Sequence, residues 1–441
     1  MNYPDSAKHS RALHERAKQY MPGGNTRTTV YIHPFPLYVA RGEGCRIWDI
    51  DGRERIDSIN NFTSQIHGHS NAHINAAVRQ QLELGTCFGM PTTAEVDLAQ
   101  VLVERIASID MLRFTNSGTE AVMMALKAAR AFTGRSKIAK VEGAYHGSYD
   151  YAEVSLDPSP RNWGDNGPAP VPYAQGTPTA VSQDVVVLPF NQPEAATRII
   201  RAHGSQLAAI LVDPLPNRAG LVPATHEYIA ALRAAADEVG ALLIFDEVIS
   251  FRLGYGGAQP LWDVTADLTT LGKVMGGGFP VGAVGGRSDV MAVFDPSHGK
   301  PALPHGGTFS ANPITMVAGK AALEQLQPDT YQRLEQMGEH VRCAANQSFA
   351  RHGLEGQAVG MGSLLKIHFT AQPIQDYRSA YPAKAEAEKL RHFHIALLNH
   401  GVLAASYGLM ALSTAMGDAD IDALCAGIDR SIQDVARQHH C

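Results

Sequence analysis

Residues 241–273 read ALLIFDEVISFRLGYGGAQPLWDVTADLTTLGK. The run that starts at Ala241 is apolar until it ends on Asp246, which is typical of a strand buried on both faces of a parallel sheet with a polar group at its carboxyl end. A second short strand is expected over 267–271, and it leads through Gly272 to Lys273. The stretch therefore predicts a carboxylate and an amine, each at the end of a strand.

An acid and an amine placed in this way suit one kind of chemistry. Lys273 is expected to form a Schiff base with an aldehyde cofactor, while Asp246 holds a proton on the ring nitrogen of that cofactor. The cofactor we predict is pyridoxal phosphate. The ordinary alternative is a solvated loop lysine and an aspartate that caps a helix, and a short motif needs its context to separate the two.

The bulk properties of the chain fit a compact enzyme. At 441 residues it exceeds the usual size of a single core, so one large and one smaller domain are expected. The net charge of −6 disfavours a nucleic-acid surface, and no apolar run approaches the roughly 20 residues of a membrane helix. The N-terminus lacks the apolar core of a signal peptide. A cytoplasmic location with reduced thiols is expected, because the cysteines are scattered and odd in number: Cys45, Cys87, Cys343, Cys425 and Cys441.

The N-terminal region is expected to form a helix over 6–20 and a hairpin from the extended pieces 37–40 and 45–50. Three histidines follow at spacings that zinc ligands also show, namely His67, His69 and His73. Because no cysteine or carboxylate clusters with them, we assign no metal.

Helix and strand signals alternate through the middle of the chain. Helices are expected over 71–84, 93–106 and 226–239, and strands over 111–115, 137–141, 184–188 and 207–213. This alternation predicts a doubly wound, mostly parallel sheet.

A strand that ends in a Ser-Gly-Thr turn marks a candidate anion site. Ser117, Gly118 and Thr119 stand where the strand over 111–115 gives way to a long helix that Gly134 ends. Free backbone N–H groups, the helix dipole and two hydroxyls all favour an anion there. A plain helix cap explains the same residues equally well in isolation.

Tyr145 follows the strand over 137–141, at the level where a ring stacks on a cofactor. A buried core tyrosine is the alternative, and the position at the crevice edge of the sheet favours stacking. Residues 157–181 carry six prolines and little periodicity, so we expect an irregular segment over the active-site entrance.

The alternation ends after residue 313. Helices are expected over 314–326, 329–350, 383–400 and 418–437, with strands over 363–369, 402–404 and 411–413. Helices on a small sheet predict a separate C-terminal subdomain.

Five motifs occur in order along the chain: NSGTEA (116–121), EGAYHG (142–147), FDEV (245–248), TTLGK with GGGFPVG (269–282) and GGTFSANP (306–313). Together they resemble the class-III aminotransferases among the fold-type I pyridoxal-phosphate enzymes. The resemblance extends over nearly the whole chain, from MPGGNTR at 21–27 onward. Within the class, the chain is similar to glutamate-1-semialdehyde aminomutase and to aminotransferases that act on β-amino acids and D-amino acids.

The resemblance implies a fold and a set of cofactor contacts. The fold is a fold-type I α/β architecture, with a large cofactor-binding domain over 65–320 and a smaller α+β domain built from 1–64 and 321–441. Lys273 carries the Schiff base and moves a proton between the substrate and the cofactor, and Asp246 pairs with the ring nitrogen. The other implied cofactor contacts are Ser117, Gly118 and Thr119 on the phosphate, Val248 and Tyr145 on the two faces of the ring, and His146 and Asp213 beside it. Thr308 would reach the phosphate of a neighbouring subunit, which implies a homodimer with shared sites.

Departures from the family pattern bear on the substrate. Arg41 matches a carboxylate-binding arginine of the β-amino-acid group, and Arg218 stands in VDPLPNRAG, where the usual pattern is VEPxxG. We expect these two arginines to bind the substrate carboxylate. Phe62 is expected to line the side-chain pocket, with core packing as its alternative. Tyr407 takes the place of another carboxylate-binding arginine.

The leading functional prediction is an aminotransferase that moves an amino group between an amino acid, of the β or D type among the candidates, and a keto acid. The alternative is intramolecular transfer of the glutamate-1-semialdehyde 2,1-aminomutase type. The aminomutases carry a glutamate in the loop that corresponds to residues 403–413, and this loop contains no acid. A racemase or decarboxylase is a weaker option. A non-catalytic cofactor-binding module is disfavoured, because both Lys273 and Asp246 are present.

Overall fold

The computed structural model describes residues 2–439, so Cys441 lies outside the described residues. Internal contacts divide the chain into two compact units. The larger unit comprises residues 73–331 and 373–381, and the smaller comprises the chain up to residue 72, residues 332–372 and the chain from residue 382 onward. The division falls at 72/73 and 331/332, whereas the boundaries expected from sequence fell at 64/65 and 320/321.

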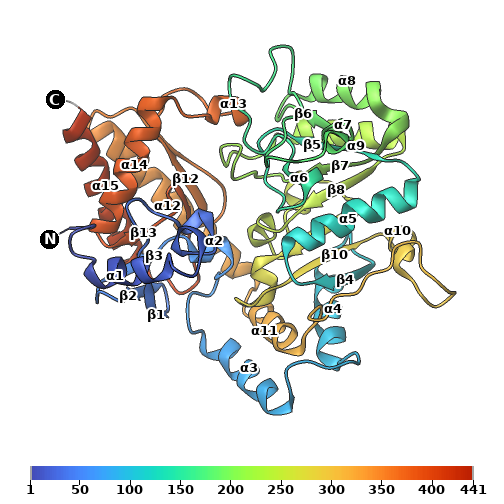
Figure 1. Ribbon diagram of the computed structural model, residues 1–441, viewed down its shortest axis with the longest axis horizontal. Coiled ribbons are helices and arrows are strands. Elements are labelled where there is room, and N and C mark those ends of the chain that lie inside the picture. Colours follow the sequence, from blue (N-terminus) through green and yellow to red (C-terminus); the bar gives the residue numbers. More distant parts are fainter. Residues whose placement is uncertain (1, 440–441) are drawn as a thin grey trace. The chain divides into compact units, whose positions relative to one another are not determined.

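The larger unit is built on a seven-stranded sheet with the order β4-β10-β9-β8-β7-β5-β6 (Figure 1). Its strands are β4 (Met111–Thr115), β5 (Lys137–Val141), β6 (Val185–Leu188), β7 (Leu207–Val212), β8 (Leu242–Asp246), β9 (Leu268–Gly272) and β10 (Gly282–Gly286). The five strands from β9 to β6 are mutually parallel, and β10 is antiparallel to both of its neighbours. The predicted α/β class with a mostly parallel sheet is confirmed.

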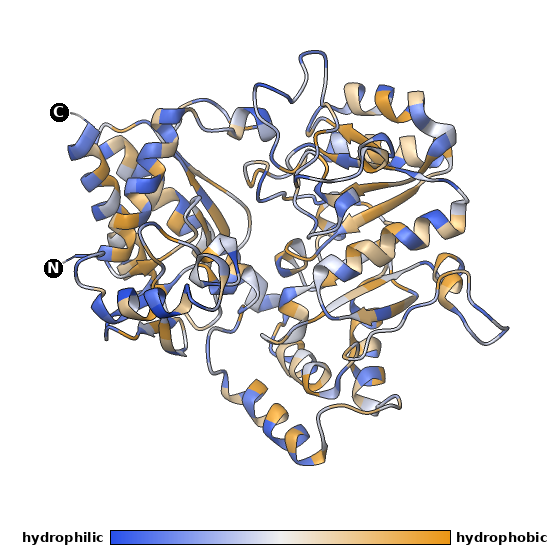
Figure 2. Ribbon diagram, in the orientation of Figure 1, coloured by the Kyte–Doolittle hydropathy of each residue, from blue (hydrophilic) through white to orange (hydrophobic). Residues whose placement is uncertain are grey.

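Helices cover this sheet, and its central strands are apolar along their length (Figure 2). The helices of the larger unit, not all of which touch the sheet, are α3 (Ala72–Leu84), α4 (Thr93–Arg105), α5 (Gly118–Thr133), α6 (Asp150–Glu153), α7 (Thr179–Gln183), α8 (Pro193–His203), α9 (His226–Val239), α10 (Ser288–Met291), α11 (Pro313–Glu324) and α13 (Tyr377–Ala380). Helix α5 packs on β10, β9 and β7, with Ser117 as its N-cap and Gly134 in the left-handed conformation at its end. The sheet therefore fixes the position and direction of this helix N-terminus.

Strand β10 was not predicted from the sequence. Its residues are GAVGG. Glycine is depleted in strands, because its backbone loses more conformational entropy on folding and it offers no side chain to pack. Here the glycines permit close approach to neighbouring backbone. A methyl group on Gly282 would overlap the carbonyl oxygen of Ser117 and the hydroxyl of Thr115.

The smaller unit holds a four-stranded sheet with the order β1-β2-β3-β13 and a three-stranded sheet with the order β11-β12-β14. The strands are β1 (Val39–Glu43), β2 (Arg46–Asp49), β3 (Glu54–Asp57), β11 (Gln357–Val359), β12 (Leu364–His368), β13 (Val402–Leu403) and β14 (Leu409–Ala411). Its helices are α1 (Lys8–Ala17), α2 (Asn60–Thr63), α12 (Pro328–Arg351, which begins in the larger unit), α14 (Lys384–Asn399) and α15 (Asp418–His439). The hairpin of β1 and β2 and the long helices α12, α14 and α15 match the sequence predictions, whereas β3 and β11 were missed. The helix expected over 314–326 is α11, which belongs to the larger unit and not to the predicted C-terminal subdomain.

No helix among residues 2–439 is both long enough and apolar enough to cross a membrane.

We expect Gly282→Ala to destabilise the protein by about 1–3 kcal/mol and to weaken binding of the cofactor predicted from the sequence, because the added methyl group must displace the turn at Ser117. Thermal unfolding and cofactor titration measure the two effects. Gly89→Ala is the matched control, since nothing lies within 4 Å of a Cβ built there. Equal behaviour of the two variants would contradict the close packing described here.

Candidate active site

Asp246 is the last residue of β8 and is held by three hydrogen-bond donors. Its Oδ2 lies 2.6 Å from Nδ1 of His146, and its Oδ1 accepts from the Thr270 hydroxyl and the Val248 backbone N–H, each at 3.0 Å. Burial alone would raise the pKa of this carboxyl, but the bonds from His146 and Val248 and the nearby charge of Lys273 leave the pKa below its ordinary value. Asp246 is therefore an ionised carboxylate in a buried setting.

His146 is fully buried, and its Nε2 has no hydrogen-bond partner among the residues the structure describes. Burial lowers the pKa of the imidazole, although the carboxylate of Asp246 opposes that effect. One ring nitrogen is thus committed to Asp246, while the other is available to a group that enters the site.

Lys273 follows β9 with a φ of 49°, a left-handed conformation that is uncommon outside glycine. A strained backbone conformation of this kind persists only where the surrounding structure holds it in place, and such conformations are frequent at functional sites. Burial lowers the pKa of the amine, and the carboxyls of Asp246 and Asp213 oppose the shift. Within residues 2–439 the amine makes no hydrogen bond or ion pair, and only the charges of Asp246 and Asp213 act on it.

Asp213 follows β7 and accepts the backbone N–H of Leu215 at 2.9 Å. Burial, followed by the negative charge of Asp246, raises the pKa of this carboxyl well above its ordinary value. The parallel strands β7, β8 and β9 thus bring a neutral acid, an ionised acid and an amine to one edge of the sheet, where open α/β sheets bind ligands.

The N-terminus of α5 lies next to this group. Ser117 caps the helix by accepting the N–H of Glu120 at 3.2 Å, and the Thr119 hydroxyl accepts the N–H of Ser148 at 3.2 Å. Gly118 faces the side chain of Val248, and a Cβ there would lie 2.8 Å from a Val248 methyl group. The helix start, with its free N–H groups, and the end of β8 are therefore packed directly together.

Tyr145 lies in the turn after β5, and 41% of its surface is exposed. Helix α13 belongs to the larger unit by its internal contacts, and it packs against one side of this turn. A Cβ on Gly143, whose φ is 74°, would fall on the ring of Tyr377. Arg378 donates to both carboxylate oxygens of Glu142 at 2.8 and 3.0 Å.

The same helix also holds the proline-rich segment over 157–181. The hydroxyl of Tyr377 donates to the Pro158 carbonyl at 2.7 Å, and Arg378 donates to the carbonyls of Trp163 and Gly164 at 2.7 and 2.9 Å. Arg218 lies 3.6 Å from the carboxylate of Asp157 in this segment. The loop is irregular, as predicted, and it is tied down by side chains.

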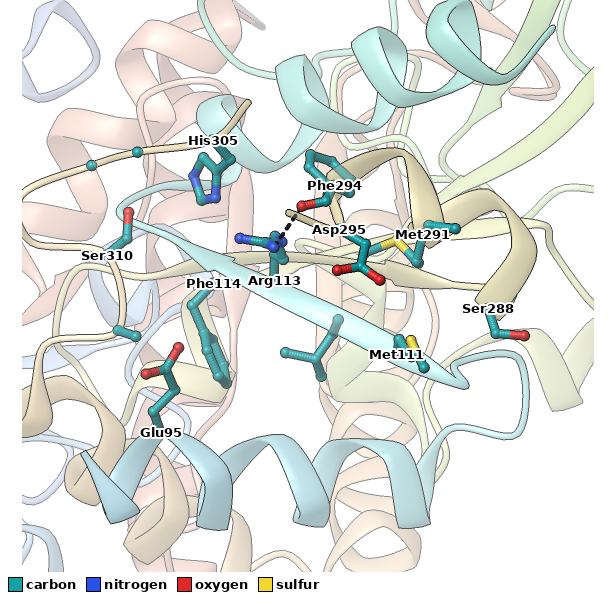
Figure 3. A pocket seen from close by; sticks show the side chains of 15 residues that line it. Glu95, Met111, Arg113, Phe114, Ser288, Met291, Phe294, Asp295, His305 and Ser310 are labelled. Atoms are coloured by element: carbon teal, nitrogen blue, oxygen red, sulfur yellow. Dashed lines mark hydrogen bonds between the residues drawn. The ribbon is translucent and has the colours of Figure 1, made fainter. Parts of the chain in front are cut away.

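Thr308 is exposed on the loop over 305–312 and is not part of the cluster around Lys273. The loop borders two pockets of about 700 and 610 Å³. In the first pocket, Arg113 points into the space between Glu95 and His305 and donates to the Phe294 carbonyl at 2.8 Å (Figure 3).

The other three predicted substrate residues lie in the smaller unit. Arg41 places its guanidinium 3.5 Å above the ring of Trp48 and pairs with Glu43 at 3.1 Å. The ring of Tyr407 lies 5.5 Å from the amine of Lys366. Arg41 is therefore held by contacts within its own sheet. Among the described contacts, Arg27 rather than Arg41 stacks on the ring of Phe62.

Phe62 belongs to a left-handed turn. Asn60, Asn61, Phe62 and Thr63 all have positive φ, and such a run costs roughly 1–2 kcal/mol per residue. The carboxylate of Asp57 accepts the N–H of Asn60 at 2.8 Å. Arg27 stacks on the Phe62 ring at 4.9 Å and donates to the Asn61 side chain at 2.7 Å, without an acidic partner among residues 2–439.

Sequence reasoning missed several of these contacts. Thr270 had one signal, a pair of threonines within a buried apolar strand. Glu142, Tyr377 and Arg378 had none, because more than 230 residues separate the acid from its arginine. Of the three early histidines, His69 bonds Asp57 and His67 bonds Thr414. No group of three or more potential metal ligands occurs in the described part of the chain.

Comparison with known proteins identifies the family of this chain. The family model for "Aminotransferase class-III" matches residues 28–432. The β-phenylalanine transaminase of Variovorax paradoxus is 39% identical over 97% of this chain and 93% of its own length. The glutamate-1-semialdehyde 2,1-aminomutase of Methanosphaera stadtmanae is 37% identical over 94% of this chain and 95% of its own. The crystal structure of an ω-transaminase from Sphaerobacter thermophilus superposes with a TM-score of 0.95 at 49% identity, covering 98% of each chain.

The chain belongs to the class-III aminotransferase family. It is a fold-type I aminotransferase that depends on pyridoxal phosphate and moves an amino group between an amino acid and a keto acid. The residues present fit that cofactor. They offer a helix N-terminus for an anion, an ionised carboxylate for a cationic ring, an amine without a partner, and a buried histidine nitrogen that is still unbonded.

We expect Arg378→Met to destabilise the larger unit by about 3–5 kcal/mol, because it leaves the buried carboxylate of Glu142 without its partner. The double variant with Glu142→Gln should recover part of that loss, since a neutral amide tolerates burial better than an unpaired charge. Denaturant unfolding gives the free energies of unfolding of Arg378→Met, of Glu142→Gln and of the double variant, which together form a double-mutant cycle. Additive effects would contradict a direct interaction.

Proposed function

We propose that Lys273 and Asp246 carry the chemistry of this aminotransferase. Pyridoxal phosphate, when bound, supplies an aldehyde carbon and a cationic ring that withdraws electrons from the substrate carbon. Lys273 would supply the amine that bonds the aldehyde carbon, since burial lowers the pKa of that amine and so increases its neutral fraction, and it would move a proton at the substrate carbon. Asp246 would hold the proton on the ring nitrogen, and His146 hydrogen-bonds Asp246.

The remaining cofactor contacts follow from their positions. Ser117, Gly118 and Thr119 would bind the phosphate at the start of α5. Val248, packed on Gly118, would support one face of the ring, and Tyr145 would cover the other. Asp213 and His146 would border the ring, with the raised pKa of Asp213 leaving it a proton to donate.

The observation that carries this proposal is one partly buried amine, without a hydrogen-bond partner in the described chain, within electrostatic reach of one ionised, buried carboxylate. We expect Lys273→Ala to abolish the absorbance shift that marks covalent attachment of the cofactor and to lower kcat by at least about 10²–10⁴-fold. Asp246→Asn should keep covalent attachment and lose most of the rate, because the ring is no longer held cationic. Full activity of the Lys273 variant would end the proposal.

For the amino donor, we propose an amino acid with an apolar side chain, of the β or D type. Support comes from the 39% identity to an enzyme named for β-phenylalanine, and from Phe62 on its left-handed turn. Arg41 and Arg218 are the proposed carboxylate ligands. Arg27, which stacks on Phe62 and lacks an acidic partner in the described chain, joins them as a third candidate. Tyr407 completes the proposed substrate contacts.

Single alanine variants separate the three arginines. The residue that binds the carboxylate should raise KM for amino acids by about 10–100-fold on substitution and leave KM for simple amines unchanged, because a charge-assisted hydrogen bond contributes roughly 1.5–3 kcal/mol. Arg201→Ala is the control, since that arginine pairs with Glu238 on the surface. If Arg41→Ala shifts both KM values alike, Arg41 is not that residue.

Aminomutase activity is the second candidate, supported by 37% identity to a glutamate-1-semialdehyde 2,1-aminomutase. The two activities differ in their need for a partner substrate. An aminotransferase turns over only when a keto-acid acceptor is added, whereas an aminomutase forms product from a single amino aldehyde. Product formation from glutamate 1-semialdehyde alone would select the mutase.

We further propose a homodimer in which Thr308 reaches the partner's phosphate site. Several large apolar side chains of the larger unit are exposed, and three of them, Phe88, Met90 and Met111, line the pockets that the loop over 305–312 borders, while Phe309 lies on the loop itself. Such exposed groups favour a protein interface. Light scattering should give twice the chain mass of 47.4 kDa. A cytoplasmic location is proposed on the free thiols of Cys45, Cys87, Cys343 and Cys425.

A further inference from the structure

The smaller unit contains a cavity of about 160 Å³ that lies within that unit alone. Its walls come from the segment before β1, from β2, β3 and α2, from α14, and from the residues after β13. Most of the lining is apolar, contributed by Val30, Ile32, Leu37, Val39, Ile47, Ile59, Phe62, Leu403, Ala404 and Ala405. A cavity of this size and lining holds one six-membered ring, because an engineered apolar cavity of about 150 Å³ binds benzene.

Two charged residues in the wall are already satisfied. Arg55 pairs with Asp49 at 2.6 Å, and both side chains are almost fully buried. Asp49 also accepts the backbone N–H groups of Asp51 and Arg53, and Arg55 donates to the Leu398 carbonyl at 3.1 Å. This pair therefore closes one side of the cavity and has little left to offer a ligand.

His394 is different. The side chain lines the cavity from α14, is 5% exposed, and has no hydrogen-bond partner on either ring nitrogen within the described chain. Burial lowers its pKa from 6.5 to about 4, so the ring is neutral near pH 7 and presents one N–H donor and one acceptor. A buried polar group without a partner is costly, and native proteins rarely keep one without a reason.

Another part of the wall is strained. Phe62 reaches the cavity from the left-handed turn over 60–63, and the amide of Asn60 anchors that turn to the Ala411 carbonyl. A cavity lined both by an aromatic ring on costly backbone and by an unpartnered imidazole is the arrangement of a binding site rather than of a filled core. A single water molecule is a poor occupant, because a bound water needs two to four polar partners and this lining is mostly apolar.

We propose that this cavity binds a neutral, ring-sized apolar group that carries one hydrogen-bonding atom, and that His394 bonds that atom. The mouth is framed by the exposed or partly exposed side chains of Thr29, Val30, Val39 and Ser406, so a ligand enters from the surface of the smaller unit. The group comes from one of two sources, the side chain of an aromatic amino donor or a separate small molecule. The binding claim concerns the shared chemistry and stands apart from the roles proposed for Lys273 and Asp246.

Phenol and toluene are matched probes, because they share one ring and phenol carries a hydroxyl where toluene carries a methyl group. Titrated into the full-length holoenzyme and followed by thermal shift and ligand NMR, phenol should bind on the order of tenfold more tightly than toluene, the ratio that one net hydrogen bond supplies. In His394→Phe that ratio should fall to about one. His392→Phe, on the same helix and outside the cavity lining, should keep the wild-type ratio.

A second variant guards against misfolding of the first. Val39→Trp alters an exposed residue at the mouth and should weaken both probes while leaving the unfolding temperature unchanged. Equal affinities for phenol and toluene, no binding of phenol at its solubility limit, or a phenol preference that survives in His394→Phe would each overturn the proposal.

Steady-state kinetics then distinguish the two sources. If phenol raises KM for a donor with an aromatic side chain but not for a donor with a methyl side chain, the donor's own ring occupies the cavity. If phenol binds and leaves both KM values unchanged, the natural occupant is a separate molecule. Either result supports the proposed site and identifies its ligand.

Discussion

The larger unit depends on keeping one carboxylate ionised in a buried position. An isolated buried charge is very unfavourable, so Asp246 is stable only because His146, Thr270 and the Val248 N–H all donate to it. Its neighbours Asp213 and Glu247 are also buried carboxyls, and both have raised pKa values, to about 7 for Glu247. Glu247 instead accepts from Ala258 and Gln259 on the other side of the chain. Different environments thus separate the pKa values of three neighbouring acids, and Asp246 is the one whose pKa stays below its ordinary value.

Much of this arrangement was predictable from local sequence. Asp246, Lys273 and Ser117 each end a strand or begin a helix, and parallel strands carry such ends to a common edge. The features that could not be predicted involve contacts between residues far apart in the sequence or an unusual backbone conformation. Arg378 meets Glu142 across 236 residues, β10 is built from glycine, and the turn at Phe62 is left-handed. The sequence pattern contains no signal for any of these, because each is stabilised by tertiary contacts rather than by local preference.

The two units show different uses of buried polar groups. In the larger unit the carboxylate of Asp246 has three hydrogen-bond donors, whereas Nε2 of His146 has no partner in the described chain. In the smaller unit the buried pair of Arg55 and Asp49 is likewise complete, while His394 is not. Both the proposed cofactor site and the cavity of the smaller unit therefore include a buried imidazole nitrogen without a partner in the described chain, while other such atoms, for example on Ser182 and Tyr228, lie elsewhere.

The pairing of β13 with β3 has a consequence for how the protein is made. Val402 lies opposite Ile56 in a parallel ladder, so the four-stranded sheet cannot close until nearly the whole polypeptide has left the ribosome. Until then the edge of β3 that later pairs with β13 has no partner, and an unpaired strand edge can associate with other chains. The continuous segment between them can meanwhile fold as a unit, since all seven strands of its sheet lie within residues 111–286. Biogenesis of this enzyme is therefore expected to proceed from the centre outward, with the two ends joined last.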